Sequence, residues 1–283
     1  MPDIRVQYIA PELVRRGWAT FRLDPGESQA FARLSETAKR FFRAPPQTLR
    51  LSEWPGHGMW AGYQPMPDGE AEIVDQVDRF EVSQAMLVSS DEEWPWLSAE
   101  ARELKQVLSA ANAIAQDLVA ASVEGVAQVS GRDPDAARRL WCHDDASTLV
   151  VNNYRSVPVK NQSVAVKMKP HADFGGLTMV QVDTGLDALQ FQASDGWQSV
   201  TSGSDDADLA VMLIGQLFAH WLGTEAPIHQ VVQNPHQSRM STVYFNQPSL
   251  DAVIVNKSGT SVVAGEHIAA MQDFYNKLGA SPA

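Results

Sequence analysis

The sequence is poor in cysteine, in positive charge and in long hydrophobic runs. Cys142 is the only cysteine, which excludes an intramolecular disulfide framework and any zinc or iron–sulfur site built on several thiolates. The chain has 22 Lys and Arg residues against 34 Asp and Glu residues, a formal net charge of −12. Nucleic-acid binding and docking to an anionic membrane both need a positive surface and are therefore disfavoured. A metal site in this chain would have to use histidine and carboxylate ligands.

The chain also lacks a run of about 18 apolar residues, the length that a membrane-spanning helix needs. Its start carries charges throughout and is unlike a secretory signal. We therefore expect a cytoplasmic protein whose partner is a small-molecule substrate, with no nucleic-acid or membrane partner; the oligomeric state is left open. A length of 283 residues allows one large domain or two.

The hydrophobic pattern changes once along the chain. Residues 1–142 have apolar side chains at helical spacing over Glu27–Arg43 and Ala101–Ala127, which predicts two helices with one buried face each. From Thr148 onward the period is two, and short β-like runs alternate with Gly, Asp, Asn and Pro. The predicted strands are Thr148–Tyr154, Leu177–Val182, Leu189–Gln192, Leu209–Ile214, Ile228–Val232 and Met240–Asn246, followed by a helix over Gly265–Leu278. Many short strands that close on themselves suggest a barrel or jelly roll, here packed against helices.

Two His-x-Asp motifs are the first candidates for a metal site. Residues i and i+2 of an extended segment share a face, so either His171 with Asp173 or His143 with Asp145 could present both groups to one ion. The motif at His143 resembles a polar turn between a helix and a strand. The motif at His171 instead leads through a Gly-Gly turn into a strand. His229, in an apolar strand, is the candidate third ligand; its alternative is a hydrogen-bonded core histidine.

Carboxylate-binding groups follow in the same region. Arg239 and Ser241 share one face of a predicted strand, and a guanidinium fork beside a hydroxyl suits bidentate capture of a carboxylate. Asn152 and Tyr154 add an amide and a phenol on one face of another strand. Two histidines and one carboxylate describe a facial site for non-haem Fe(II), with three positions open for a chelating cosubstrate and O₂.

The order of these motifs resembles the isopenicillin N synthase-like group of Fe(II)/2-oxoglutarate-dependent oxygenases. The matching residues are, in order, Asn152 and Tyr154, His171 and Asp173, Leu177 and Thr178, Gly196 and Trp197, His229, and Arg239 and Ser241. Segments around Gly17-Trp18-Ala19, Gly62-Tyr63 and Arg79-Phe80-Glu81 resemble the non-catalytic region of that group, so the similarity covers nearly the whole chain. The chain departs from the common pattern at Gln216, where Asp is frequent, and at Gln230, where Arg is frequent.

The resemblance implies an α+β fold with a mainly β core, a double-stranded β-helix (jelly roll, cupin-like) with surrounding helices. It implies that Fe(II) is held by His171, Asp173 and His229. It implies that the distal carboxylate of 2-oxoglutarate meets Arg239 and Ser241, with Tyr154 and Asn152 assisting. The predicted organisation is one compact unit over 1–283, with a helix-rich non-catalytic region 1–142, an oxygenase barrel 148–250 and a C-terminal helix 264–279.

The activity implied by the resemblance is oxidation of a small organic substrate by O₂ and 2-oxoglutarate, with release of succinate and CO₂. Hydroxylation, desaturation or ring closure in natural-product or secondary metabolism, such as antibiotic biosynthesis, would fit. Halogenation is not expected, because Asp173 occupies the position that halogenases of the superfamily leave open for halide. One alternative is an oxidase similar to isopenicillin N synthase or aminocyclopropane-carboxylate oxidase, which does not use 2-oxoglutarate. Another is a barrel that binds a metal or small ligand without catalysis.

Contacts to the substrate are harder to read from the sequence. Trp60, Tyr63 and Phe80 are candidates for the mouth of a substrate pocket, with packing of the N-terminal half on the barrel as the alternative for each. The C-terminal helix either closes over the site as a lid or packs on the core.

Overall fold

The computed structural model of the chain describes residues 5–50, 52–53, 62–66, 77–90, 92, 97–142, 146–156, 165–182, 188–200, 208–233 and 238–279. The helices are α1 Val6–Arg16, α2 Pro25–Phe42, α3 Pro46–Arg50, α4 Gln84–Val88, α5 Ala99–Val129, α6 Pro134–Trp141, α7 Gln216–Leu222 and α8 Ala264–Gly279. The strands are β1 Trp18–Arg22, β2 Gly62–Gln64, β3 Asp78–Ser83, β4 Thr148–Tyr154, β5 Ala165–His171, β6 Leu177–Val182, β7 Leu189–Ala193, β8 Gly196–Ser199, β9 Leu209–Ile214, β10 His229–Gln233, β11 Arg239–Phe245, β12 Val253–Val255 and β13 Ser261–Val263.

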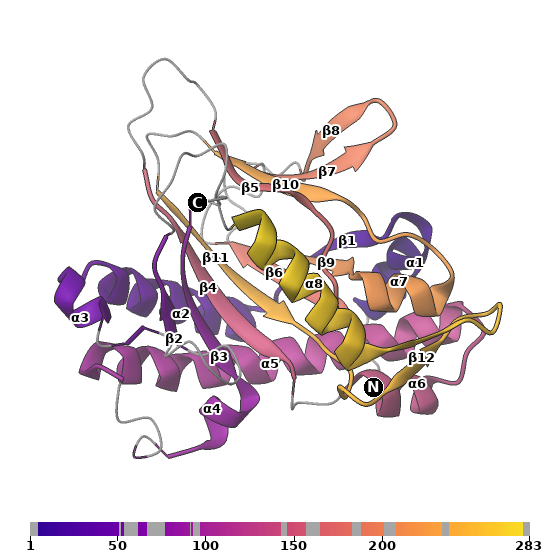
Figure 1. Cartoon of the computed structure of the whole chain (residues 1–283), viewed down its shortest axis with the longest axis horizontal. Helices are drawn as coiled ribbons and strands as arrows, with labels where there is room; N and C mark the ends of the chain where they lie inside the picture. Colours follow the sequence, from indigo (N-terminus) through magenta and orange to yellow (C-terminus); the bar gives the residue numbers. More distant parts are fainter. Residues whose placement is uncertain are drawn as a thin grey trace.

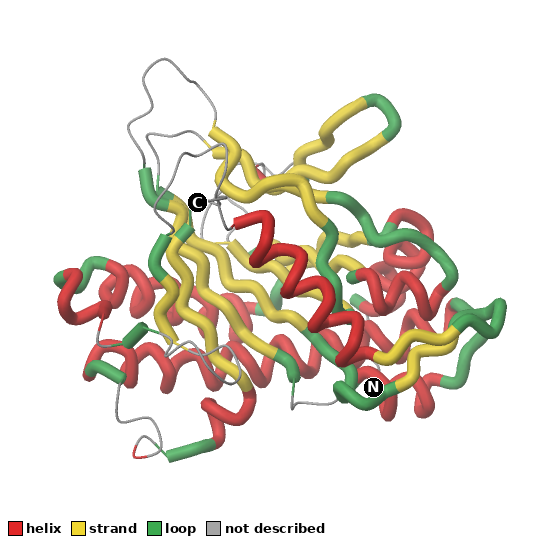
Figure 2. The backbone as a smooth tube through the Cα atoms, in the orientation of Figure 1, coloured by secondary structure: helices red, strands yellow, loops and turns green. Residues whose placement is uncertain are grey.

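Two antiparallel sheets and a helical layer build the fold (Figures 1 and 2). The major sheet has the order β1-β9-β6-β11-β4-β3-β2, and the minor sheet has the order β5-β10-β7-β8. Their non-consecutive strand order is that of a jelly roll, which confirms the predicted fold class. The strands predicted over Thr148–Tyr154, Leu177–Val182 and Leu209–Ile214 have the bounds expected from the sequence.

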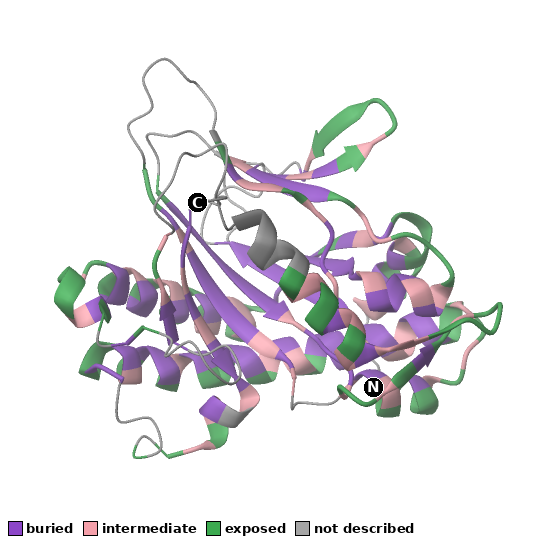
Figure 3. Cartoon of the chain, in the orientation of Figure 1, coloured by how far each residue is buried: buried purple, intermediate pink, exposed green. Residues whose placement is uncertain are grey.

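The major sheet is buried on both faces. Leu149 and Val151 of β4 belong to a core shared with the helices, whereas Tyr154 belongs to a second core shared with the minor sheet. Because side chains of a strand alternate between faces, this double burial explains why β6 is buried at every residue, including the polar Thr178 and Gln181. Figure 3 shows these central strands as largely buried, while β8 and the turn of the β7–β8 hairpin are exposed.

The helical layer consists mainly of α2 and α5, which pack against each other and against the outer face of the major sheet. The side chain of Ser98 caps α5 by accepting a hydrogen bond from the Ala101 N–H (3.1 Å), and Asp24 with Glu27 forms a capping box at the start of α2. These caps satisfy backbone donors that the first turn leaves unpaired. The N-terminal half thus supplies the helices and also three strands of the sheet, β1, β2 and β3.

Helix α8 crosses in front of β4 and β11, on the side of the major sheet opposite to α5 (Figure 1). Its start is anchored by Ala264 and Ile268, which are buried, and by the β12–β13 hairpin that precedes it. Within the described ranges no helix is long and apolar enough to cross a membrane.

Candidate active site

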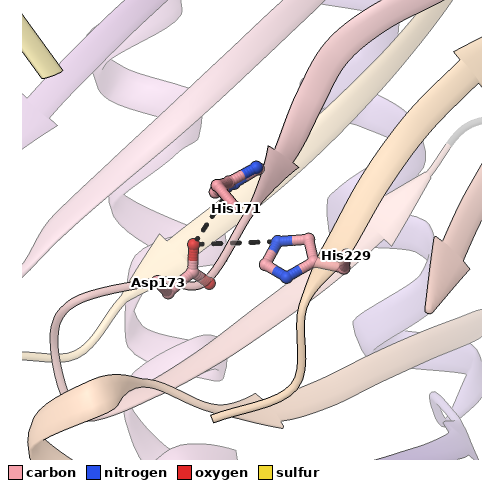
Figure 4. A group of neighbouring side chains, drawn as sticks. All are labelled: His171, Asp173 and His229. Atoms are coloured by element: carbon pink, nitrogen blue, oxygen red, sulfur yellow. Dashed lines mark ion pairs between the residues drawn. The ribbon is translucent and has the colours of Figure 1, made fainter. Parts of the chain in front are cut away.

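His171 and His229 meet where two strands of the minor sheet lie side by side. His171 is the last residue of β5, and His229 is the first residue of β10 and its direct partner in the antiparallel ladder. Asp173 follows β5 by two residues and points between the two rings (Figure 4). Its Oδ1 atom lies 3.6 Å from Nε2 of His171 and 3.8 Å from Nε2 of His229. All three ligand atoms lie within 4.8 Å of one another, close enough to share one metal ion.

Backbone carbonyls orient both imidazoles. Nδ1 of His171 lies 2.7 Å from the Lys169 carbonyl oxygen, and Nδ1 of His229 lies 3.3 Å from the Pro227 carbonyl oxygen. A carbonyl only accepts, so each Nδ1 carries the hydrogen and each Nε2 keeps its lone pair for a metal. Burial lowers the pKa of His229 to about 4, an effect that the nearby Asp173 carboxylate opposes in part. The neutral imidazole that results at pH 7 is the form that binds a metal.

The turn that carries Asp173 is held by the corner between β9 and α7. The Gln216 N–H donates to the Asp173 carbonyl oxygen (2.7 Å), and the Gly215 N–H donates to the Gly176 carbonyl oxygen (2.6 Å). A Cβ at Gly215 would lie 2.5 Å from the Gly175 carbonyl oxygen, so this close approach requires glycine. The backbone of Asp173 and of the turn that follows it is therefore held by contacts to this corner.

The donor set fits a divalent iron. Oδ2 of Asp173 is buried and has no hydrogen-bond partner among the described residues, although a buried carboxylate oxygen normally finds one. Two neutral imidazoles and one carboxylate satisfy Fe(II) on one face and leave three positions open. A bound cation would give Oδ2 of Asp173 the partner that it lacks among the described residues.

Four further predicted residues come together on the inner face of the major sheet. Arg239 lies opposite Tyr154, and Ser241 lies opposite Asn152, in the β11–β4 ladder. The Arg239 guanidinium is 5.3 Å from the centre of the Tyr154 ring, and Nδ2 of Asn152 donates to Oγ of Ser241 (3.3 Å). All four side chains are buried. A buried guanidinium and hydroxyl on one face form a site for a carboxylate.

Both groups line the same interior. The ring of Phe191 lies 5.8 Å from the His229 ring, centre to centre, and Phe191 belongs to the core cluster that also contains Tyr154. That cluster fills the space between the two sheets. We call His171, Asp173 and His229 the histidine cluster. The arginine cluster consists of Arg239, Ser241, Asn152 and Tyr154. The two clusters thus lie in one barrel and do not form two separate sites.

The structure does not bring the predicted substrate contacts to this interior. Tyr63 and Phe80 lie in the core on the helix side of the major sheet, where the Phe80 ring is 5.0 Å and the Tyr63 ring 6.0 Å from the ring of Phe41. The Tyr63 hydroxyl donates to Asp78 (3.0 Å). Both side chains thus take the packing role that was the alternative for them, while Trp60 and the His143 motif lie outside the described residues.

The inner face of β3 holds polar residues that were not singled out from the sequence. Glu81 and Arg79 alternate with Phe80 and therefore point to the opposite face, where Arg79 lies opposite Asn152. Nε2 of Gln64 donates to Oε2 of Glu81 (3.1 Å), and burial raises the pKa of the Glu81 carboxyl. The alternation in Arg79-Phe80-Glu81 shows that the two charged residues share a face. Only the pairing of β3 with β4 shows that this face also carries Asn152.

Sequence comparison with known proteins finds similarity to 2OG-Fe(II) oxygenases. Residues 133–248 match the sequence model described as "2OG-Fe(II) oxygenase superfamily". The chain is 26% identical over 183 residues to gibberellin 2-beta-dioxygenase 6 of Oryza sativa subsp. japonica, a match that covers 62% of this chain and 49% of the relative. The chain spans half or less of the length of the curated relatives that it matches.

Solved structures share the fold over nearly the whole chain. A full-length Neurospora crassa protein in complex with alpha-KG (2-oxoglutarate) and thymine superposes with a TM-score of 0.81 at 17% identity, over 95% of this chain and 91% of that one. A 2OG-Fe(II) oxygenase family protein from Caulobacter crescentus superposes with a TM-score of 0.78 at 18% identity, over 96% and 94% of the two chains. Residues 133–248 therefore form a 2OG-Fe(II) oxygenase domain, and the cofactors of that superfamily are Fe(II) and 2-oxoglutarate.

Proposed function

We propose that this protein is a non-haem Fe(II)- and 2-oxoglutarate-dependent dioxygenase that oxidises a small organic substrate. The observation that carries the proposal is the convergence of two imidazoles and a carboxylate within 4.8 Å, inside the barrel that also buries Arg239. When bound, Fe(II) would supply the activation of O₂ that couples oxidation of 2-oxoglutarate to succinate and CO₂ with oxidation of the substrate.

In this proposal, His171, Asp173 and His229 hold the iron. The carbonyls of Lys169 and Pro227 keep both Nε2 atoms directed at the ion by accepting the Nδ1 hydrogens. Such outer contacts raise the basicity of the imidazole and fix its ring orientation. The ligands come from the ends of two paired strands, so the site is rigid before the ion arrives.

The arginine cluster would hold the distal carboxylate of 2-oxoglutarate. Arg239 offers a planar fork of N–H donors, which matches the two oxygens of a carboxylate. Asn152 donates to Oγ of Ser241, and this leaves the hydroxyl hydrogen of Ser241 for the ligand. The Tyr154 ring, 5.3 Å from the guanidinium carbon, supports the arginine from one side.

The two alternative functions are not favoured. An oxidase that does not use 2-oxoglutarate would keep the iron ligands, but the matching superfamily is named for 2-oxoglutarate, and the Neurospora crassa structure contains it in the same fold. A barrel that only binds a small ligand would not need an intact two-histidine, one-carboxylate cluster. The cytoplasmic location, the role in secondary metabolism and the division into regions stay predictions. The thymine in the Neurospora crassa complex supports a small-molecule substrate in general terms.

The test adds Fe(II) and then 2-oxoglutarate to the purified protein without oxygen. We expect a weak visible charge-transfer band from the chelate, and O₂-dependent succinate formation with a competent substrate. The His220→Ala variant is a matched control, because His220 lies on α7 and contacts the Thr260 carbonyl, away from the cluster. The absence of both the band and the succinate from the wild-type protein would refute the proposal.

A further inference from the structure

Lys167 is a buried lysine without a carboxylate partner among the described residues. Its side chain lies in β5 and is 1% exposed. Its ammonium donates one hydrogen bond, to the Arg155 carbonyl oxygen (3.0 Å). No acidic side chain in the described part of the chain forms an ion pair with it. An ammonium has three N–H donors, so two remain for another acceptor.

An irregularity in the ladder turns Lys167 inward. Val231 of β10 pairs with Met168, while the next residue, Val232, pairs with Val166. Lys167 is therefore the extra residue of a β-bulge and has no partner across the ladder. Val166 is exposed, whereas Lys167 is buried and Met168 packs against the core between the sheets, so the strand departs from regular alternation at this point. Bulges of this kind re-aim side chains near active sites.

Burying such a charge without a counterion is unfavourable. Lysine is rarely buried completely unless it is paired, and a backbone carbonyl replaces only part of its hydration. Burial accordingly lowers the pKa of the Lys167 ammonium. Methionine would fill the same space without this cost. The position thus has the properties of an anion site rather than of a packing residue.

Lys167 lies at the end of the barrel that contains Arg239. The carbonyl that it contacts belongs to Arg155, the residue after Tyr154, and Tyr154 faces Arg239 across the ladder. The lysine therefore reaches from the minor sheet to the end of β4, which pairs with the start of β11. The Arg155 guanidinium is committed to the buried Asp78 (2.8 Å from Nη2 to Oδ1) and does not compete for a ligand here.

We propose that Lys167 is a second cationic contact for the distal carboxylate of 2-oxoglutarate, beside Arg239. This inference rests on the proposed function. The two oxygens of a carboxylate offer about four lone-pair sites, enough for a guanidinium fork, the Ser241 hydroxyl and an ammonium. The ligand would bring the negative charge that the described residues do not supply to Lys167.

The test compares two keto acids on the Fe(II)-loaded, oxygen-free protein by titration calorimetry. 2-Oxopentanoate has the keto-acid end of 2-oxoglutarate but a methyl group in place of the distal carboxylate. In the Lys167→Met variant we expect the Kd of 2-oxoglutarate to rise about 10- to 100-fold, the range for a lost charged hydrogen bond. The Kd of 2-oxopentanoate should stay nearly unchanged. The Lys257→Met variant, on an exposed turn, is the control and should bind both acids like the wild type.

A second variant separates the effect of the charge from the effect of the hydrogen bond to the Arg155 carbonyl oxygen. Lys167→Gln keeps an N–H donor for the Arg155 carbonyl but removes the charge, and it should lose 2-oxoglutarate affinity like the methionine variant. Without ligand, Lys167→Met should melt at the same temperature as the wild type or higher, because a buried charge is removed. Unchanged 2-oxoglutarate affinity, or an equal loss for both acids with a lower melting temperature, would refute this role for Lys167. A wild-type protein that does not bind 2-oxoglutarate would instead refute the proposed function.

Discussion

His171 and His229 face each other across one antiparallel strand pair, with ring centres 4.3 Å apart. One ligand thus ends β5 and the other begins β10, so a bound metal ion would tie the two strands together where their ladder stops. Asp173 adds the turn that leads to β6 in the other sheet. The metal would therefore act as a cross-link between the two sheets as well as a catalytic group.

Fe(II) should stabilise the folded protein strongly. An ion that binds only the folded state adds about 2.7 kcal/mol at a hundredfold excess over its Kd. We expect the melting temperature of the oxygen-free protein to rise on addition of Fe(II) and to fall back after chelation. The His171→Ala variant should show little of this increase. An equal increase in the variant and the wild type would place the ion elsewhere.

The choice between the two His-x-Asp motifs can be tested directly. His171→Ala should abolish iron-dependent succinate formation, because it removes one of three ligands. His143→Ala should leave the activity near the wild-type level, since the sequence predicts a polar turn there. Equal loss in the two variants would show that His143 belongs to the site.

Replacement of Arg239 by Gln should affect the cosubstrate more than the metal. The variant loses the bidentate, charged contact to the distal carboxylate, which corresponds to about 1.5–3 kcal/mol. We expect a higher concentration of 2-oxoglutarate for half-maximal succinate formation, with a nearly unchanged iron requirement. The reverse order of effects would contradict the assignment. Arg15→Gln, an exposed helix position, is a suitable control.

The convergence of His171, Asp173 and His229, and the burial of Arg239 in the same barrel, could be predicted because these residues combine short local spacings with a fixed order along the chain. The strands β4, β6 and β9 could be predicted because each is a short run rich in apolar residues, which their two buried faces require, bounded by Gly, Asp, Asn or Pro. β5 could not: it contains Lys167, Lys169 and Pro170, and its bulges break the period of two. The face of the sheet on which a side chain lies depends on strand pairing, which the sequence does not reveal.

Tyr63 and Phe80 illustrate the same limit of sequence patterns. Their aromatic side chains suggested a pocket mouth, but pairing of β2 and β3 with the sheet turns both toward Phe41 and the helices. In the same strands, Gln64 and Glu81 face the barrel side. A pattern of alternation tells which residues share a face, but not which face is the inner one.

Removal of the Tyr63 hydroxyl should therefore cost stability and leave ligand binding intact. The hydroxyl donates to Asp78, a buried carboxylate that Arg155 also contacts. Tyr63→Phe should lower the free energy of unfolding by about 1 kcal/mol, the net value of one such hydrogen bond. Denaturant unfolding measures this loss, and titration with 2-oxoglutarate should show unchanged affinity. Unchanged stability together with altered substrate kinetics would show that Tyr63 contacts the substrate instead.

Glu81 should give stability a distinct dependence on pH. Its pKa is raised from 4.5 in the folded state by burial, which outweighs the hydrogen bonds from Thr148 and Gln64. The folded protein therefore holds this proton more tightly than the unfolded chain, and the favourable contribution of the group is present below about pH 4.5 and lost as pH rises through the folded pKa. Glu81→Gln removes this titration. Its stability relative to the wild type should increase between pH 4.5 and neutral pH, as measured by denaturant unfolding of the metal-free proteins. A difference that stays constant or shrinks over this interval would show that Glu81 is ionised and well solvated in the folded protein.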